Sequence, residues 1–197
     1  MKRILLAGIL GGVTLFVWMF VAHELLGLGE VGVKEIPNEA AVMTAMQVAI
    51  PDAGFYIFPG FGIGPKPSRE QMNAAMPAYM KKYEKSGHGI LIYHPPQSGA
   101  FNFGVLLGRE FGLNVLQALL AAWLLSCAAN GRTYGKRVAF VAVAGILAAL
   151  STNVEYWNWY DFPGNYIAAY MTTQISGFIL AGLVIGGLVK NGTPARS

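Results

Sequence analysis

Four long apolar segments dominate the chain, and most of its polar residues lie between them. They run from Ile4 to Leu26, Gly112 to Ala129, Val138 to about Val154, and Tyr166 to Val189. A helix of about 20 residues is about 30 Å long, which matches the hydrocarbon thickness of a bilayer. The pattern therefore predicts four transmembrane helices.

The ends of the first two segments need separate interpretation. Ile4 to Leu26 is longer than the roughly 7–15 apolar residues of a signal peptide and lacks a small-x-small cleavage site, so we predict a retained helix. Asn114 and Gln117 interrupt the start of the second segment. We expect that segment to begin as an interfacial helix near Phe103.

The segment between the first two predicted spans has a regular pattern of its own. Pro37-Asn38-Glu39 is a typical helix start, and Gly54 to Pro59 and Gly89 to Pro95 are aromatic and β-branched runs typical of strands. We therefore predict a small α+β cap over residues 28–111. Residues 1–27 form the first span, and residues 112–197 contain the other three spans and a C-terminal tail.

A second cap helix is predicted between the two strands. Ser68 and Gln71 have the spacing of a capping box, in which side chains satisfy the free N–H groups of a helix start. Gly87 is a suitable stop, and Pro77 is expected to kink or split the helix because it lacks an N–H donor.

A polar and aromatic run, Asn153 to Gly164, separates the last two spans. Trp and Tyr favour the headgroup layer, and Pro163-Gly164 supplies a chain reversal. We predict a tight turn at the membrane surface. Its aromatic belt consists of Tyr156, Trp157, Trp159 and Tyr160.

The composition supports a polytopic membrane protein. Hydrophobic residues make up 54% of the chain and charged residues only 12%, against roughly 25% charged in soluble domains. The formal net charge is +4, but the basic residues flank apolar segments and do not cluster on a soluble face. We therefore expect the lipid bilayer as a partner and do not expect nucleic acid.

The charges also predict an orientation. Basic residues alone flank one end of the spans, and every Asp and Glu falls on the other side. These basic residues are Lys2, Arg3, Arg132, Lys136, Arg137, Lys190 and Arg196. Because cytoplasmic loops carry excess Lys and Arg, both termini are expected in the cytoplasm and the cap outside it.

Several short motifs resemble an uncharacterised family of small bacterial four-span inner-membrane proteins. They are Gly11-Gly12, Trp18, His23, Gly29-Glu30, Pro37-Asn38-Glu39, Phe58-Pro59-Gly60, Tyr93-His94-Pro95 and the run from Tyr156 to Pro163. The resemblance covers most of the chain. It implies a bacterial inner-membrane location and this topology, and it implies no activity and no functional residues.

One candidate site is a polar cluster near the outer ends of the spans. The topology places six side chains at similar depth: His23, Glu24, Asn114, Gln117, Glu155 and Asp161. Ionisable groups near hydrocarbon are costly and often functional. The interpretation we favour is structural, in which these groups reach the headgroup layer and hydrogen-bond the turn to the first span.

His23 has a further interpretation as an axial ligand of a haem or chlorophyll-type pigment, since neutral imidazole is a common donor. No other predicted span contains His, and Met171 is the nearest alternative second ligand. The sequence therefore requires no cofactor.

Copper binding is the alternative for the second cap helix. Met72, Met76 and Met80 recur at helical spacing, with His88 and His94 nearby, and thioethers with imidazole suit Cu(I). A Met stripe is more often core packing, and that is the interpretation we favour.

Two glycine pairs have the spacing that permits close helix packing: Gly8 with Gly12, and Gly182 with Gly186. Packing within the chain is the expected use of Gly182 and Gly186, and packing against another subunit is the alternative.

The chain lacks recognisable catalytic motifs, including HExxH, GxSxG, phosphate-binding and CxxC patterns, and its single Cys127 has no metal-ligand spacing. We therefore expect a non-enzymatic accessory or structural subunit of a larger bacterial membrane complex, respiratory or photosynthetic. The alternative is a binding protein or enzyme for a lipid, quinone or metal at the outer leaflet, using His23 and Glu155.

Overall fold

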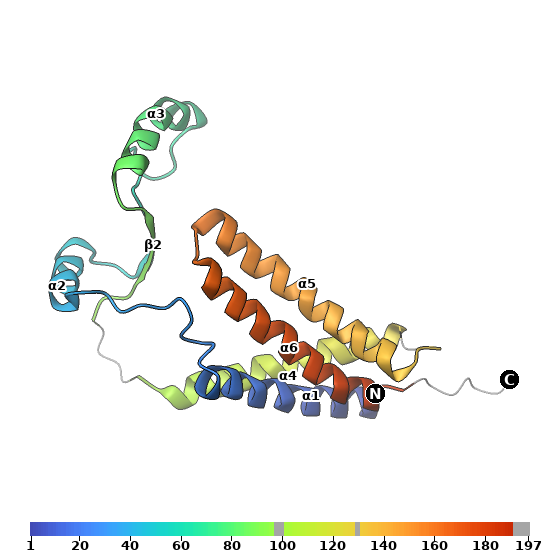
Figure 1. Cartoon of the computed structure of the whole chain (residues 1–197). Helices are drawn as coiled ribbons and strands as arrows, with labels where there is room; N and C mark the ends of the chain where they lie inside the picture. The colour runs from blue at the N-terminus through green and yellow to red at the C-terminus, as the bar shows by residue number, and fades with distance from the viewer. Residues whose placement is uncertain (97–100, 129–130, 191–197) are drawn as a thin grey trace. The chain divides into compact units, whose positions relative to one another are not determined.

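The protein divides into two compact units, which are described separately (Figure 1). A computed structural model describes residues 1–96, 101–128 and 131–190. The described residues of Met1–Val33 and Phe101–Ser197 form the helical unit, and those of Lys34–Ala100 form the small unit.

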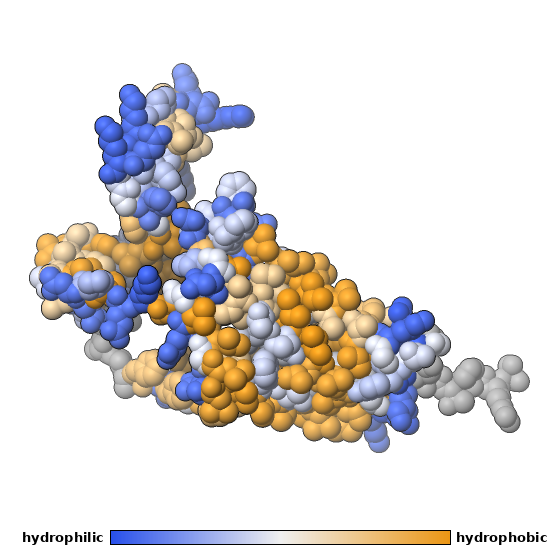
Figure 2. Space-filling view, in the orientation of Figure 1, coloured by the Kyte–Doolittle hydropathy of each residue, from blue (hydrophilic) through white to orange (hydrophobic). Residues whose placement is uncertain are grey.

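Four long helices build the helical unit. They are α1 (Lys2–Phe20), extended by the π-helix η1 (Val21–Leu25), α4 (Phe103–Ala128), α5 (Tyr134–Tyr160) and α6 (Gly164–Leu188). All four are long and apolar enough to cross a membrane, which confirms the number of predicted apolar helices and suggests a multi-pass membrane protein. Figure 2 shows a largely hydrophobic surface over these helices, as lipid contact requires.

One predicted helix boundary is confirmed and one is corrected. α4 begins at Phe103, where the second span was expected to start as a helix, whereas α5 continues to Tyr160, beyond Val154. The prediction of a tight turn over the whole Asn153–Gly164 run is therefore wrong. Glycine and proline are missing from the run until Pro163, so the helix ends only at Asp161, which adopts a left-handed conformation with φ 55°.

The four helices pack as two antiparallel pairs. α1 packs against α4, α5 packs against α6, and α1 joins the pairs through α6 (Figure 1). The shared core consists of small and aliphatic side chains: Ala7, Leu15, Ala118, Ala121, Ala122, Leu125, Val141, Ala181, Ile185 and Val189. Most of this core lies towards the unit's basic end. The first turns of α4 and the last turns of α5, at the opposite end, are mostly exposed.

Glycine allows the close contacts within each pair. A Cβ at Gly12 would lie 2.5 Å from the Cα of Val115 in α4, and one at Gly8 would lie 2.3 Å from the Leu119 side chain. Gly182 and Gly186 face α5, where an added Cβ would lie 3.2–3.3 Å from Val138 atoms. Side chains at these positions would push the helices apart.

The small unit contains α2 (Glu39–Ala49), β1 (Gly54–Phe58), α3 (Arg69–Lys85) and β2 (Gly89–Tyr93). The strands form an antiparallel pair in which Gly54 lies opposite Tyr93. The predicted two strands are therefore confirmed, with the chain leaving β1 through a cis Phe58-Pro59 bond.

α3 begins with the predicted capping box. The Gln71 N–H donates to Ser68 Oγ at 3.1 Å, and the Ser68 N–H donates to Gln71 Oε1 at 2.8 Å. Of the two expectations for Pro77, the split is wrong, because α3 continues through it to Lys85, and the kink stays a prediction. Pro77 and Asn73 are both exposed, so water can bond the Asn73 carbonyl that lacks its usual donor.

Aromatic rings attach α3 to the rest of the small unit. Tyr79 stacks on Phe61 and Tyr83 stacks on His88, each with ring centroids 4.1 Å apart. Lys82 Nζ also donates to the Gly60 carbonyl at 3.3 Å. Although α3 has these contacts, none of its residues is buried.

Candidate functional site

The end of α1 widens into a π-helical turn that contains His23 and Glu24. The Leu26 N–H donates to the Val21 carbonyl at 3.0 Å, which is the i to i−5 pattern of a π-helix. Such single turns insert one extra residue and often occur at functional sites. The chain leaves the turn at Gly27, whose φ of 64° favours glycine.

The following loop folds back against His23 and α6. A Cβ at Gly29 would lie 3.0 Å from Cδ2 of the His23 ring, and one at Gly32 would lie 2.8 Å from Cβ of Tyr166. These approaches leave no room for side chains at the two glycines. The loop is thereby held between η1 and the first turns of α6.

A pocket of about 430 Å³ lies within this arrangement. Its lining comes from η1, from the loop and from α6: His23, Glu24, Gly27, Gly29, Glu30 and Tyr170. Two carboxylates face it, and the described lining contains no Lys or Arg. We call this the His23 pocket.

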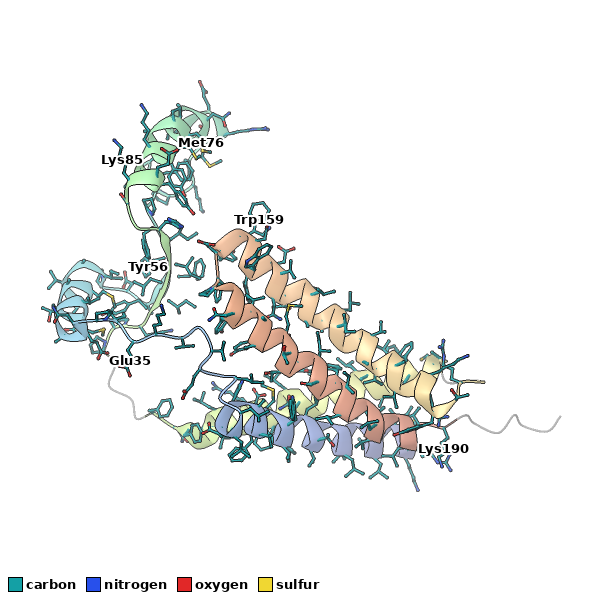
Figure 3. The ribbon with its side chains drawn as sticks, in the orientation of Figure 1. Glu35, Tyr56, Met76, Lys85, Trp159 and Lys190 are labelled. Atoms are coloured by element: carbon teal, nitrogen blue, oxygen red, sulfur yellow. The ribbon has the colours of Figure 1, made fainter. Side chains whose placement is uncertain are left out.

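A row of aromatic rings leads from the end of α5 to the His23 pocket. Successive ring centroids are 4.8–6.3 Å apart. The row consists of Tyr160, Tyr156, Phe162, Tyr166, Tyr170 and His23. Tyr156 and Tyr160 belong to the predicted aromatic belt, and its other two members, Trp157 and Trp159, are exposed at the end of α5 (Figure 3 labels Trp159).

The structure distributes the six residues of the predicted polar cluster over different surroundings. His23 and Glu24 line the His23 pocket, whereas its described lining does not include Asn114, Gln117, Glu155 or Asp161. Asn114 is buried in α4, and its Nδ2 donates to Glu110 Oε1 of the same helix at 3.0 Å. Gln117, Glu155 and Asp161 are exposed.

Sequence reasoning missed four residues of the pocket: Gly27, Gly29, Glu30 and Tyr170. Glu30 carried one signal, as a carboxylate shortly after the end of an apolar segment. Tyr170 carried none, because the contact of α1 with α6 brings it to His23 across a long sequence separation.

Binding of a haem or pigment at His23 stays a prediction. In the described ranges, no group of three or more His, Cys, Asp or Glu side chains is arranged to hold a metal ion.

The methionines of α3 are not core residues. Met72, Met76 and Met80 are 38%, 41% and 50% exposed, so the packing interpretation is wrong for this helix (Figure 3 labels Met76). The neighbouring His88 stacks on Tyr83. Copper binding by Met72, Met76, His88 and His94 stays a prediction.

Side-chain hydrogen bonds also join the apolar helices to one another. Trp18 Nε1 in α1 donates to the Thr173 carbonyl in α6 at 2.9 Å. Near the basic end, the buried Arg137 donates from Nε to the Gly186 carbonyl at 2.8 Å. Arg137, which the sequence pattern placed among the flanking charges, thus caps the last turn of α6.

One glycine-rich helix face is uncovered. Gly104, Gly108 and Gly112 recur every four residues in α4. Among the described residues, nothing outside the helix lies within 4 Å of a Cβ built at Gly108 or Gly112. At Gly104 the nearest atom is Asn102 Oδ1, at 3.4 Å. We call these three residues the α4 glycine face.

Comparison with protein families, with curated proteins and with solved structures finds no match to this chain.

Proposed function

We propose that the chain is a multi-pass protein of the bacterial inner membrane, with both termini in the cytoplasm. Four helices of sufficient length and apolarity support insertion. The basic residues at one end of these helices, among them Lys2, Arg132 and Lys190, support the orientation. The small unit then lies on the outer side.

Cysteine labelling tests this orientation. In a Cys127→Ser background, a membrane-impermeant maleimide added to intact spheroplasts is expected to label Ser68→Cys in the small unit. It is expected to leave Thr133→Cys, between α4 and α5, unlabelled until the membrane is opened. The reverse pattern would require the opposite orientation.

We further propose that the protein is an accessory or structural subunit of a larger membrane complex. The α4 glycine face carries this proposal. Without a hydrophobic driving force between helices in lipid, small residues promote association because they let backbones approach closely. A helix of another subunit fits such a face.

The other glycine pairs of the chain support this use. Gly8 and Gly12 are covered by α4, and Gly182 and Gly186 are covered by α5. The pairs within α1 and α6 thus each contact a helix, whereas the α4 glycine face has no helix against it among the described residues.

The test is purification from the native membrane at endogenous expression, in nanodiscs, followed by mass spectrometry. We expect the wild-type chain to retain stoichiometric partner chains and Gly108→Leu/Gly112→Leu to lose them. Gly135→Leu is the matched control, since Gly135 of α5 is also open and the glycine four residues before it, Gly131, lies outside the helix. A wild-type chain found only as a monomer, or partners retained by the double variant, would contradict the proposal.

The His23 pocket favours a second function, binding of a small molecule at the outer leaflet. Its volume, its two carboxylates and its position at the ends of α1 and α6 support this function. A small molecule that copurifies with the wild-type chain and is lost from Glu24→Gln/Glu30→Gln would establish it.

A further inference from the structure

We propose that the His23 pocket binds its ligand through a positively charged ammonium group. This inference rests on the second proposed function and does not depend on the accessory-subunit role. The lining contains the carboxyl groups of Glu24 and Glu30 and, among the described residues, no Lys or Arg side chain. An anion would meet two carboxylates there, whereas a cation gains charge-assisted hydrogen bonds.

The arrangement of the possible metal-ligand side chains in the pocket favours an organic cation over a bare metal ion. His23, Glu24 and Glu30 all line the pocket, yet these three do not form a metal-binding group. A metal ion needs its ligands within about 2–2.6 Å of one point. An ammonium group on a larger molecule can instead contact carboxylates spread around a pocket of about 430 Å³.

The aromatic wall fits the same chemistry. The rings of His23 and Tyr170 have centroids 6.3 Å apart with an interplanar angle of 50°, and Tyr166 lies behind Tyr170 at 4.8 Å. Aromatic faces attract ammonium groups through cation–π interaction, particularly at sites shielded from water. Gly27 and Gly29 also line the pocket and add no side chains to it.

Two sources of an ammonium group can reach the pocket. The pocket lies where α1 ends and α6 begins. If these helices span the bilayer as proposed, this position is at the depth of the lipid headgroups. The primary ammonium of an ethanolamine lipid headgroup and that of a free aliphatic amine present the same chemistry there. The experiment has one arm for each source.

The lipid arm uses nanodiscs with equal amounts of phosphatidylethanolamine and phosphatidylglycerol, and native mass spectrometry of the released protein. We expect the wild-type chain to retain about ten times as much ethanolamine lipid as glycerol lipid. This ratio is the effect expected of one charge-assisted hydrogen bond. Glu24→Gln/Glu30→Gln is expected to lose this preference. Glu155 is an exposed carboxylate outside the lining, so Glu155→Gln is expected to keep the lipid preference.

The free-amine arm uses lipid-depleted protein in detergent. We expect 1,4-diaminobutane to raise the melting temperature of the wild-type chain and of Glu155→Gln, and not of the double variant. The neutral isostere 1,4-butanediol is the matched control ligand. A shift with the diamine and no lipid preference would assign a free amine, and the reverse result would assign the lipid.

The inference is overturned if neither arm shows a response, or if the double variant responds like the wild-type chain. In a further outcome, the wild-type chain retains the two lipids equally, the double variant loses them, and the diamine causes no shift. That outcome would support small-molecule binding and would contradict recognition of an ammonium group. Circular dichroism checks that the variants fold, and Glu30→Gln alone gives a second readout with the same expected direction.

Discussion

Asn153 of α5 and Gln174 of α6 form a side-chain hydrogen bond between two apolar helices. Nδ2 of Asn153 donates to Oε1 of Gln174 at 2.7 Å and also to the Ala149 carbonyl of its own helix at 2.9 Å. Asn153 is 4% exposed. Both amide hydrogens of a buried donor are thus satisfied, which is the condition for a polar group inside an apolar unit to stabilise it.

Replacing Asn153 with alanine is therefore expected to weaken the α5–α6 pair. The Gln174 oxygen would lose its donor, at a cost of about 0.6–2 kcal/mol in the free energy of unfolding. Unfolding in mixed detergent micelles measures this, and a double-mutant cycle with Gln174→Ala isolates the pair. Ser151→Ala is the control, because Ser151 is exposed and bonds only its own helix at Ala148. Strictly additive effects in the cycle would show that the pair has no coupling energy.

Gly145 is expected to tolerate no side chain. A Cβ there would lie 2.3 Å from Cβ of Phe178 in α6, so α5 and α6 would have to separate. Gly145→Ala is expected to reduce the free energy of unfolding by about 1–3 kcal/mol.

Gly135→Ala provides the matched comparison for Gly145→Ala. It lies on the same helix with nothing within 4 Å among the described residues, and alanine favours a helix more than glycine does. We expect Gly135→Ala to be neutral or slightly stabilising. Equal effects of the two substitutions would show that helix contact does not determine the cost at Gly145.

The helices and strands were predictable because their signals are local. About 20 consecutive apolar residues suffice to indicate a spanning helix, and the Ser68–Gln71 box and the Pro-closed strands need only a few neighbouring residues. The end of α5 was less predictable. The polar and aromatic residues after Val154 lower the hydropathy, although the helix continues through them to Tyr160.

The His23 pocket depends on contacts that spacing does not encode. The π-helical turn, the left-handed Gly27 and the fold of the loop onto α6 place Glu30 and Tyr170 beside His23. Sequence reasoning grouped residues by depth in a bilayer, which identified His23 and Glu24. It had no means of deciding which helices are neighbours, and so it grouped them with Asn114 and Glu155.

Arg137 is expected to contribute to stability as well as to topology. Its Nε donates to the Gly186 carbonyl at 2.8 Å and its Nη1 to the Arg132 carbonyl at 3.3 Å. Arg137→Met keeps much of the side-chain length and removes the donors, so we expect a loss of about 1.5–3 kcal/mol in the free energy of unfolding.

Lys136→Met is the control for Arg137→Met. It removes the same charge from the adjacent residue, which is exposed. It is expected to change stability by less than about 0.5 kcal/mol, as is usual for surface positions. If both substitutions reduce stability equally, the charge near the helix ends is responsible and the hydrogen bonds of Arg137 are not.

The capping box of α3 gives a prediction for the small unit. Ser68→Ala removes the acceptor of the Gln71 N–H, and alanine at this position typically costs about 1 kcal/mol. Because α3 buries none of its residues, the loss should appear as local opening of its first turn. Hydrogen exchange of the amides at residues 70–72 is expected to accelerate about fivefold.

Ser86→Ala, at the opposite end of the same helix, is the control and should leave these amides unchanged. Acceleration spread equally over all of α3 would instead mean that the helix opens as one unit, held mainly by the stacking of Tyr79 on Phe61 and of Tyr83 on His88.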